Sequence, residues 1–183
     1  MAEEGNTRGG GWARELRHGS PHGAEAPQPT PPWGARVWAA CGDGDWERAL
    51  QLLSSGEGEP SDLSILMSGE GSQGEALSSL HLAASKGRYD VVAALLRRGC
   101  DVSIRTLPSG RTSLHLAMDM LNIVAEAVAQ PAEPDRAQAM DSLPFITTVK
   151  LLLVNGGSSL PGAKDIDNKT CWEYCDPETV RNE

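Results

Sequence analysis

Residues 78–102 read Ser-Ser-Leu-His-Leu-Ala-Ala-Ser-Lys-Gly-Arg-Tyr-Asp-Val-Val-Ala-Ala-Leu-Leu-Arg-Arg-Gly-Cys-Asp-Val, and this stretch decides the fold. Its apolar residues predict two short helices, the first ending at Gly87 and the second at Gly99. Asp90, which precedes the second apolar run, is expected to cap that helix. Helices this short are marginal in water on their own, so the pair requires neighbours that bury its apolar faces.

The sequence supplies those neighbours, because the same pattern returns further along the chain. The run Leu-His-Leu-Ala at 80–83 appears again at 114–117, a spacing of 34 residues, and a Leu-Leu pair followed by glycine appears at 95–99 and at 152–156. A hydroxyl residue stands ahead of each Leu-His-Leu-Ala run. A helical pattern with a period near 33 predicts a stack of repeated helix pairs, since each pair covers the open face of the next.

These motifs resemble the ankyrin repeat, whose Thr-Pro-Leu-His-x-Ala core is present here twice without its proline. The resemblance implies an all-α ankyrin-repeat solenoid with short β-hairpin fingers and about three and a half repeats. The residues that the resemblance assigns to the structural motif are Ser78, Leu80, His81, Ala83, Gly87, Leu95, Leu96, Gly99, Thr112, Leu114, His115, Ala117, Leu152, Leu153 and Gly156.

Composition divides the chain into a tail and a repeat domain. Residues 1–35 are rich in Gly and Pro and are expected to be a disordered tail, either without a fixed partner or acting as a proline-motif ligand. Residues 36–183 are expected to form the repeat domain. Within it we expect a degenerate capping repeat at 36–56, an acidic insertion at 57–76, a repeat at 77–109, a repeat with an inserted extended helix and loop at 110–164, and a partial terminal repeat at 165–183.

Both insertions admit two interpretations. The acidic one contains the apolar residues Leu63, Ile65, Leu66 and Met67, which either rest on the stack within a mobile loop or form a lip over the binding face. In the later insertion the first helix continues until Pro131, and a second helix is expected over about 146–154. Its apolar face either folds against the stack or is offered to a partner. Folding back would use Met140, Leu143 and Phe145.

Substitutions within the repeat pattern identify the ends of the array. In the first repeat Trp38 stands in the place of the histidine, which is typical of a terminal repeat that meets water on one face. In the last repeat Asn168 stands where Gly110 does, and Glu173 replaces the histidine.

Charge and hydropathy exclude several classes of protein. The net charge of −9 argues against general nucleic-acid or membrane binding. An uninterrupted apolar run of about 18 residues is lacking, so we expect no membrane span. The N-terminus carries Glu3 and Glu4 and has no apolar segment, so it does not resemble a secretory signal peptide. We therefore expect an intracellular protein, cytoplasmic or nuclear.

The candidate chemical groups favour a structural role over catalysis. The resemblance implies that His81 bonds to the hydroxyl of Ser78, that His115 bonds to that of Thr112, and that both rings reach neighbouring backbone. The sequence contains no glycine-rich phosphate loop, nucleophile elbow or paired acid motif, so we expect no enzyme and no cofactor. The alternative is a zinc- or thiol-dependent site at Cys171 and Cys175, which would share one face of a helix.

The resemblance also implies a function, which is protein–protein recognition by a scaffold or adaptor. In ankyrin proteins the finger tips and first helices line a concave binding surface. Basic residues gather on those elements here, and they predict a partner with an acidic segment, solvated loop charge being the alternative. The chain alone is expected to be monomeric, and a truncated regulatory fragment of a longer repeat protein is a further alternative. The residues expected to bind the partner are Lys86, Arg88, Tyr89, Arg105, Leu107, Arg111, Met118 and Asp119.

Overall fold

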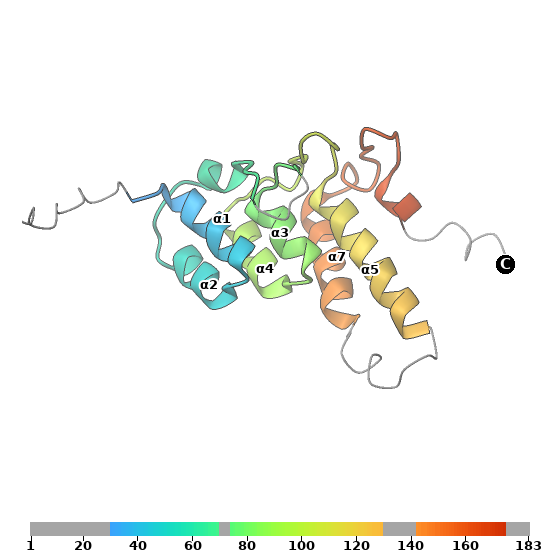
Figure 1. Cartoon of the computed structure of the whole chain (residues 1–183), viewed down its shortest axis with the longest axis horizontal. Helices are drawn as coiled ribbons and strands as arrows, with labels where there is room; N and C mark the ends of the chain where they lie inside the picture. Colours follow the sequence, from blue (N-terminus) through green and yellow to red (C-terminus); the bar gives the residue numbers. More distant parts are fainter. Residues whose placement is uncertain (1–29, 70–73, 130–141, 175–183) are drawn as a thin grey trace, which may run out of the picture. The chain divides into compact units, whose positions relative to one another are not determined.

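The computed structural model describes residues 30–69, 74–129 and 142–174. The chain divides into two compact units, Met1–Thr30 and Pro31–Glu183, and every described helix belongs to the second. Helices follow one another in pairs along it (Figure 1). The first pair is α1 (Trp33–Asp43) with α2 (Trp46–Ser54), the second is α3 (Ser79–Ser85) with α4 (Tyr89–Arg97), and the third is α5 (Ser113–Ala129) with α7 (Leu143–Gly156). Two short 3₁₀ helices complete the described elements, η1 (Pro60–Ser64) and η2 (Cys171–Tyr174).

The pairs stack in two layers. The first helices α1, α3 and α5 contact one another in that order, and the second helices α2, α4 and α7 do the same, while the partners of each pair also touch. Helix η1 packs on α1 and α3, and η2 packs on α5. Within the described residues the β-structure consists of isolated bridges, of which Ala76 with Leu107 joins two neighbouring fingers and the others lie within a single connecting segment. The all-α stack of helix hairpins is therefore confirmed.

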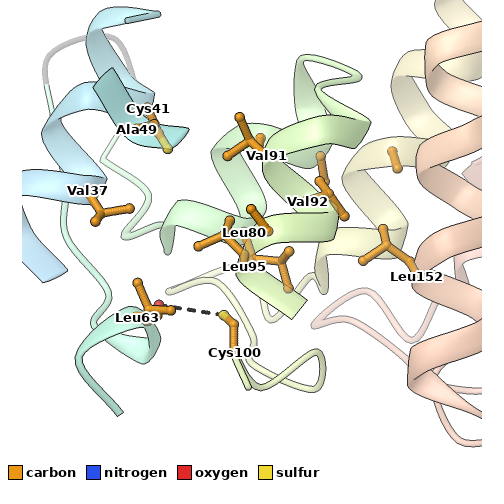
Figure 2. Packing of buried hydrophobic residues seen from close by; sticks show 14 of the residues in the cluster. Val37, Cys41, Ala49, Leu63, Leu80, Val91, Val92, Leu95, Cys100 and Leu152 are labelled. Carbon is orange, nitrogen blue, oxygen red and sulfur yellow. Dashed lines mark hydrogen bonds between the residues drawn. The ribbon is translucent and has the colours of Figure 1, made fainter. Parts of the chain in front are cut away.

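One continuous apolar core runs through the stack, and Figure 2 shows its middle part. Leu80 and Leu95 of the second helix pair and Leu152 of the third are at most 1% exposed. Leu96 was assigned to the same structural motif as Leu95, but it is only partly buried and packs against this core. Two consecutive residues of a helix point in different directions, so a helix that packs on one side buries one of them more deeply than the other.

The described part of the acidic insertion is packed against the stack. Leu63 in η1 is 1% exposed, and its carbonyl faces the Cys100 thiol (Figure 2). The insertion also covers Trp33, whose ring lies where a side chain on Gly58 would be, because a Cβ there would stand 2.0 Å from the ring. Gly58 has a φ of +69°, a backbone conformation that favours glycine.

The structured region begins earlier than the composition suggested. Helix α1 begins at Trp33, inside the stretch 1–35 that was predicted to be a tail. The Trp33 side chain is 6% exposed, and its indole N–H donates to the carbonyl of Leu52 over 3.0 Å. An aromatic ring that finds both apolar contacts and a hydrogen-bond partner gains enough to begin a helix directly after a proline run.

The long third pair differs from its prediction at the start of its second helix. Helix α5 has 17 residues, compared with 7 in α3, so the predicted extension of the first helix is present. Helix α7 begins at Leu143, three residues before the predicted start. Phe145 folds against the stack, since its ring lies about 3.0 Å from the place of a Cβ on Gly87, whereas Leu143 is 63% exposed. Met140 lies outside the described residues.

Candidate functional site

Both motif histidines are held at both ring nitrogens. The backbone N–H of Ser78 donates to Nδ1 of His81 over 3.2 Å, and the Ser78 hydroxyl lies 2.8 Å from the same nitrogen. A backbone N–H can only donate, so Nδ1 accepts and the neutral ring carries its proton on Nε2. That N–H then donates to the carbonyl of Arg111 over 3.3 Å. His115 repeats the arrangement with Thr112 at the same distances.

A ring N–H joins each repeat to the next, and we call this contact the ring staple. The acceptor is always the carbonyl of the residue just before the hydroxyl position of the following motif. That carbonyl also accepts a backbone N–H from its own finger. The three ring staples are Trp38 to Leu77 (2.7 Å), His81 to Arg111 (3.3 Å) and His115 to Lys169 (3.3 Å).

Electrostatics keep the histidines neutral. Burial lowers the pKa of His81 to about 4, against the opposing effect of its hydrogen bond to the Arg111 backbone. Burial also lowers the pKa of His115. A general base must reach the proton that it abstracts, and both rings are at most 1% exposed with every nitrogen occupied. The structural role predicted for the two histidines agrees with this geometry.

The last repeat keeps the local geometry of the motif with different residues. Glu173 occupies the histidine position, and its carboxylate accepts from the backbone N–H of Thr170 over 2.5 Å and from its hydroxyl over 2.9 Å. These hydrogen bonds lower the pKa of Glu173. Asn168 has a φ of +62°, close to the +69° of Gly110, so it performs the left-handed turn of the glycine that it replaces.

Backbone hydrogen bonds run from finger to finger. Ala76 and Leu107 exchange two of them, at 2.7 and 3.2 Å, and the N–H of Ile166 donates to the carbonyl of Ser109 over 2.9 Å. Three neighbouring fingers are therefore connected through their main chains. A surface on these fingers is pre-organised, which lowers the entropy that binding must overcome.

The arginines predicted to face a partner are already engaged within the stack. Arg105 donates to the carbonyls of Gly110 (3.0 Å) and Lys164. Arg111 pairs with Asp119 at 2.9 Å and lies over the Tyr174 ring at 4.3 Å. These contacts hold both side chains in place, while Arg105 remains exposed, so a partner with an acidic segment at the fingers stays a prediction.

Only some of the predicted partner-binding side chains at the turn between α3 and α4 are exposed. Arg88 forms a bidentate pair with Asp90, at 3.1 and 2.7 Å, and lies over the Trp46 ring. This pairing lowers the pKa of Asp90. Asp90 is therefore not the predicted helix cap, because Arg88 occupies that position. Lys86 and Tyr89 are exposed.

Apolar side chains are exposed on two connected fingers. Leu107 is 58% exposed and Ile166 is 69% exposed, and their fingers are the ones joined through Ser109. Met118, predicted as a partner contact, is instead 4% exposed and belongs to the core. Sequence reasoning did not select Ile166, although the alignment of Asn168 with Gly110 indicated that its finger matches that of Leu107.

The cysteines give the zinc or thiol alternative no support. Cys171 is completely buried in the core cluster, and its thiol faces the carbonyl of Pro161. Cys175 lies outside the described residues. No grouping of three metal-ligating side chains occurs among the residues that the structure describes. Within the same residues, no helix is both long and apolar enough to cross a lipid bilayer.

Comparisons with known proteins agree with the observed geometry. The family model for the ankyrin repeat matches residues 77–107. The crystal structure of the ankyrin repeat domain of Bcl-3, described as a unique member of the IkappaB protein family, superposes with a TM-score of 0.50 and 17% identity. This match covers 79% of the chain and 48% of the Bcl-3 chain, and at that identity it shows the fold alone.

Curated relatives match only part of the chain. The nuclear factor NF-kappa-B p105 subunit of Gallus gallus is 32% identical over 78 residues, which is 39% of this chain and 8% of the relative. The probable E3 ubiquitin-protein ligase XBOS33 of Oryza sativa subsp. japonica is 37% identical over 81 residues, which is 44% of this chain and 14% of the relative. The chain therefore spans less than a sixth of either relative.

Proposed function

We propose, on the premise that this chain is an ankyrin repeat protein, that it is a scaffold or adaptor holding a partner protein against its fingers and first helices. Ankyrin repeats are generally protein–protein interaction modules. The observation that carries the proposal is the pair of exposed apolar side chains, Leu107 and Ile166, on fingers that are joined by a backbone hydrogen bond. Exposed apolar groups on a rigid support are the usual centre of a protein interface.

The other residues of the proposed surface take different roles. Lys86 and Tyr89 offer exposed side chains at the turn between α3 and α4. Arg105, Arg111 and Asp119 contact other parts of the stack and so hold the fingers in place. Their role in binding is to fix the position of the finger surface that the partner contacts. An acidic segment of the partner at the fingers stays a prediction, because the exposed Arg105 keeps its charge. A cytoplasmic or nuclear location and a monomeric state remain predictions.

The experiment compares proteins captured from a cell extract by matched surface variants. Leu107→Asp combined with Ile166→Asp changes the two finger side chains, whose backbone hydrogen bonds do not depend on side-chain identity. Val154→Asp is the control, because Val154 on α7 is 83% exposed and lies on a second helix. We expect the finger variant to lose proteins that the wild-type chain and the control retain, with unchanged thermal unfolding. Equal capture by all three would contradict the proposed surface.

A further inference from the structure

A second group of arginines lies on and next to the second helices α2 and α4. Helix α2 carries Arg48 together with Glu47, α4 ends with Arg97, and Arg98 follows as its C-cap. Within the described part of the chain, no carboxylate forms an ion pair with any of these three arginines. Asp90 at the start of α4 is already paired with Arg88. The charges of Arg97 and Arg98 are therefore not offset by an ion pair within the described residues, although the whole chain is acidic.

A groove lies between these two helices, which pack side by side below the fingers in Figure 1. Its volume is about 430 Å³, and the small side chains of Ser54 and Ala94 are among those that line it. Pockets that hold a small ligand, or a few side chains of a peptide, measure roughly 300–1,000 Å³. The lining residues are Leu50, Gln51, Leu53, Ser54, Ala94, Arg97 and Arg98.

The floor of this groove is apolar and its rim is basic. Leu53 and Ala94 belong to the core cluster, and Leu50 packs against it. Arg97 is exposed, and its Nε donates to the carbonyl of Ala93 over 3.2 Å. Arg98 is held in place, since it donates to the backbone of residues 57 and 58.

Arg98 is also stacked over the Trp33 ring at 4.9 Å. A guanidinium fixed in this way loses little further entropy on binding, and its charge and its remaining N–H groups attract a carboxylate. The neighbouring hollow on α2 contains Glu57, but that carboxylate is paired with Arg36 at 2.5 Å. It therefore does not neutralise the arginine rim.

We propose that the groove between α2 and α4 binds an acidic amphipathic segment of a partner protein. Apolar side chains of the segment would rest on Leu50, Leu53 and Ala94, and its carboxylates would pair with Arg97 and Arg98. An amphipathic helix laid into an apolar groove is a recurrent mode of peptide recognition, and charged residues at the rim select the partner. This surface is separate from the fingers, so it goes beyond the function proposed above.

The test selects binders from a random library of 16-residue peptides displayed on phage, using the full chain as the target. We expect the selected peptides to be enriched in Asp and Glu together with large apolar residues. Their affinity, measured by fluorescence polarisation on synthetic copies, should fall by about tenfold or more with Arg97→Glu. Lys150→Glu is the matched control, since Lys150 is an exposed cation on α7 outside the groove, and it should change affinity by less than about twofold.

Charge reversal makes the test specific. A selected peptide whose acidic residues are replaced by Lys should bind Arg97→Glu better than it binds the wild-type chain. If Arg97→Glu alters the unfolding midpoint, Arg97→Gln replaces it. The proposal is overturned if no peptides are selected, if acidic residues are not enriched, or if Arg97→Glu binds as tightly as wild type. It is also overturned if sedimentation shows a dimer that Arg97→Glu dissolves, because the occupant is then a second copy. None of these results depends on the finger variants, so the two proposals can fail separately.

Discussion

At the boundary between the first two repeats an indole donates to the backbone of the next finger, whereas at the following boundary an imidazole does. Trp38 reaches the carbonyl of Leu77 over 2.7 Å, and His81 reaches that of Arg111 over 3.3 Å. Both acceptors hold the same place in their motifs and both also accept a finger N–H. The two boundaries differ in the second hydrogen bond of the ring. His81 also bonds to the hydroxyl of Ser78, three residues before it, whereas the residue three before Trp38 is Ala35, which has no hydroxyl. The acceptor is therefore the constant part of the ring staple, and the donor can vary.

The largest effect should come from breaking the core that supports both boundaries. Leu95→Asp places a charge where the side chain is 0% exposed, and it should cost at least about 4 kcal/mol of unfolding free energy. Leu96→Asp is the matched variant at the partly buried neighbour and should cost about 1–2 kcal/mol. Urea denaturation followed by circular dichroism measures both. Similar losses for the two would mean that the helix faces are assigned wrongly.

Acid should separate the histidine boundary from the tryptophan boundary. The folded pKa of His81 is about 4, below the ordinary value of 6.5, so the unfolded chain binds more protons between these two pH values. The contribution of His81 is complete above pH 6.5 and is lost as the pH falls towards 4, a change of about 3 kcal/mol. Trp38 does not titrate. Urea midpoints measured from pH 7 to pH 4.5 should show a shallower decline for His81→Gln than for wild type, and an unchanged slope would place the ring in water.

The smallest effect should come from the tryptophan boundary itself. Trp38→Phe removes the indole N–H, but the Leu77 carbonyl retains its hydrogen bond from Met67, so the loss should be about 0.5–1.5 kcal/mol. Trp172→Phe is the control, because that side chain is 50% exposed on η2, and it should change stability by less than about 0.5 kcal/mol. Thermal melting of the two variants side by side measures the difference. A loss beyond about 3 kcal/mol would show that Trp38 acts through packing and not through its ring staple.

Local sequence patterns predicted the elements, because each helix pair is specified by residues close together in the chain. The hydroxyl-to-histidine contact spans three positions, and the left-handed turn at Asn168 follows from its alignment with Gly110. The roles of Arg105 and Arg111 could not be read in the same way. Arg105 reaches a carbonyl 59 positions away, and only the stacking of the fingers brings the two together. The groove between α2 and α4 was missed for a similar reason, since it depends on the distance between helices.

The contact between Trp33 and Gly58 has a consequence for related sequences. The indole occupies the volume that any larger residue at position 58 would need, and the left-handed backbone there already disfavours other residues. A homologue that loses the tryptophan frees that space, and one that loses the glycine must place its aromatic ring elsewhere. The two positions should therefore covary, even though 24 residues separate them. Homologues that keep both the tryptophan and the glycine are expected to pack the acidic insertion against the first helix pair in the same way.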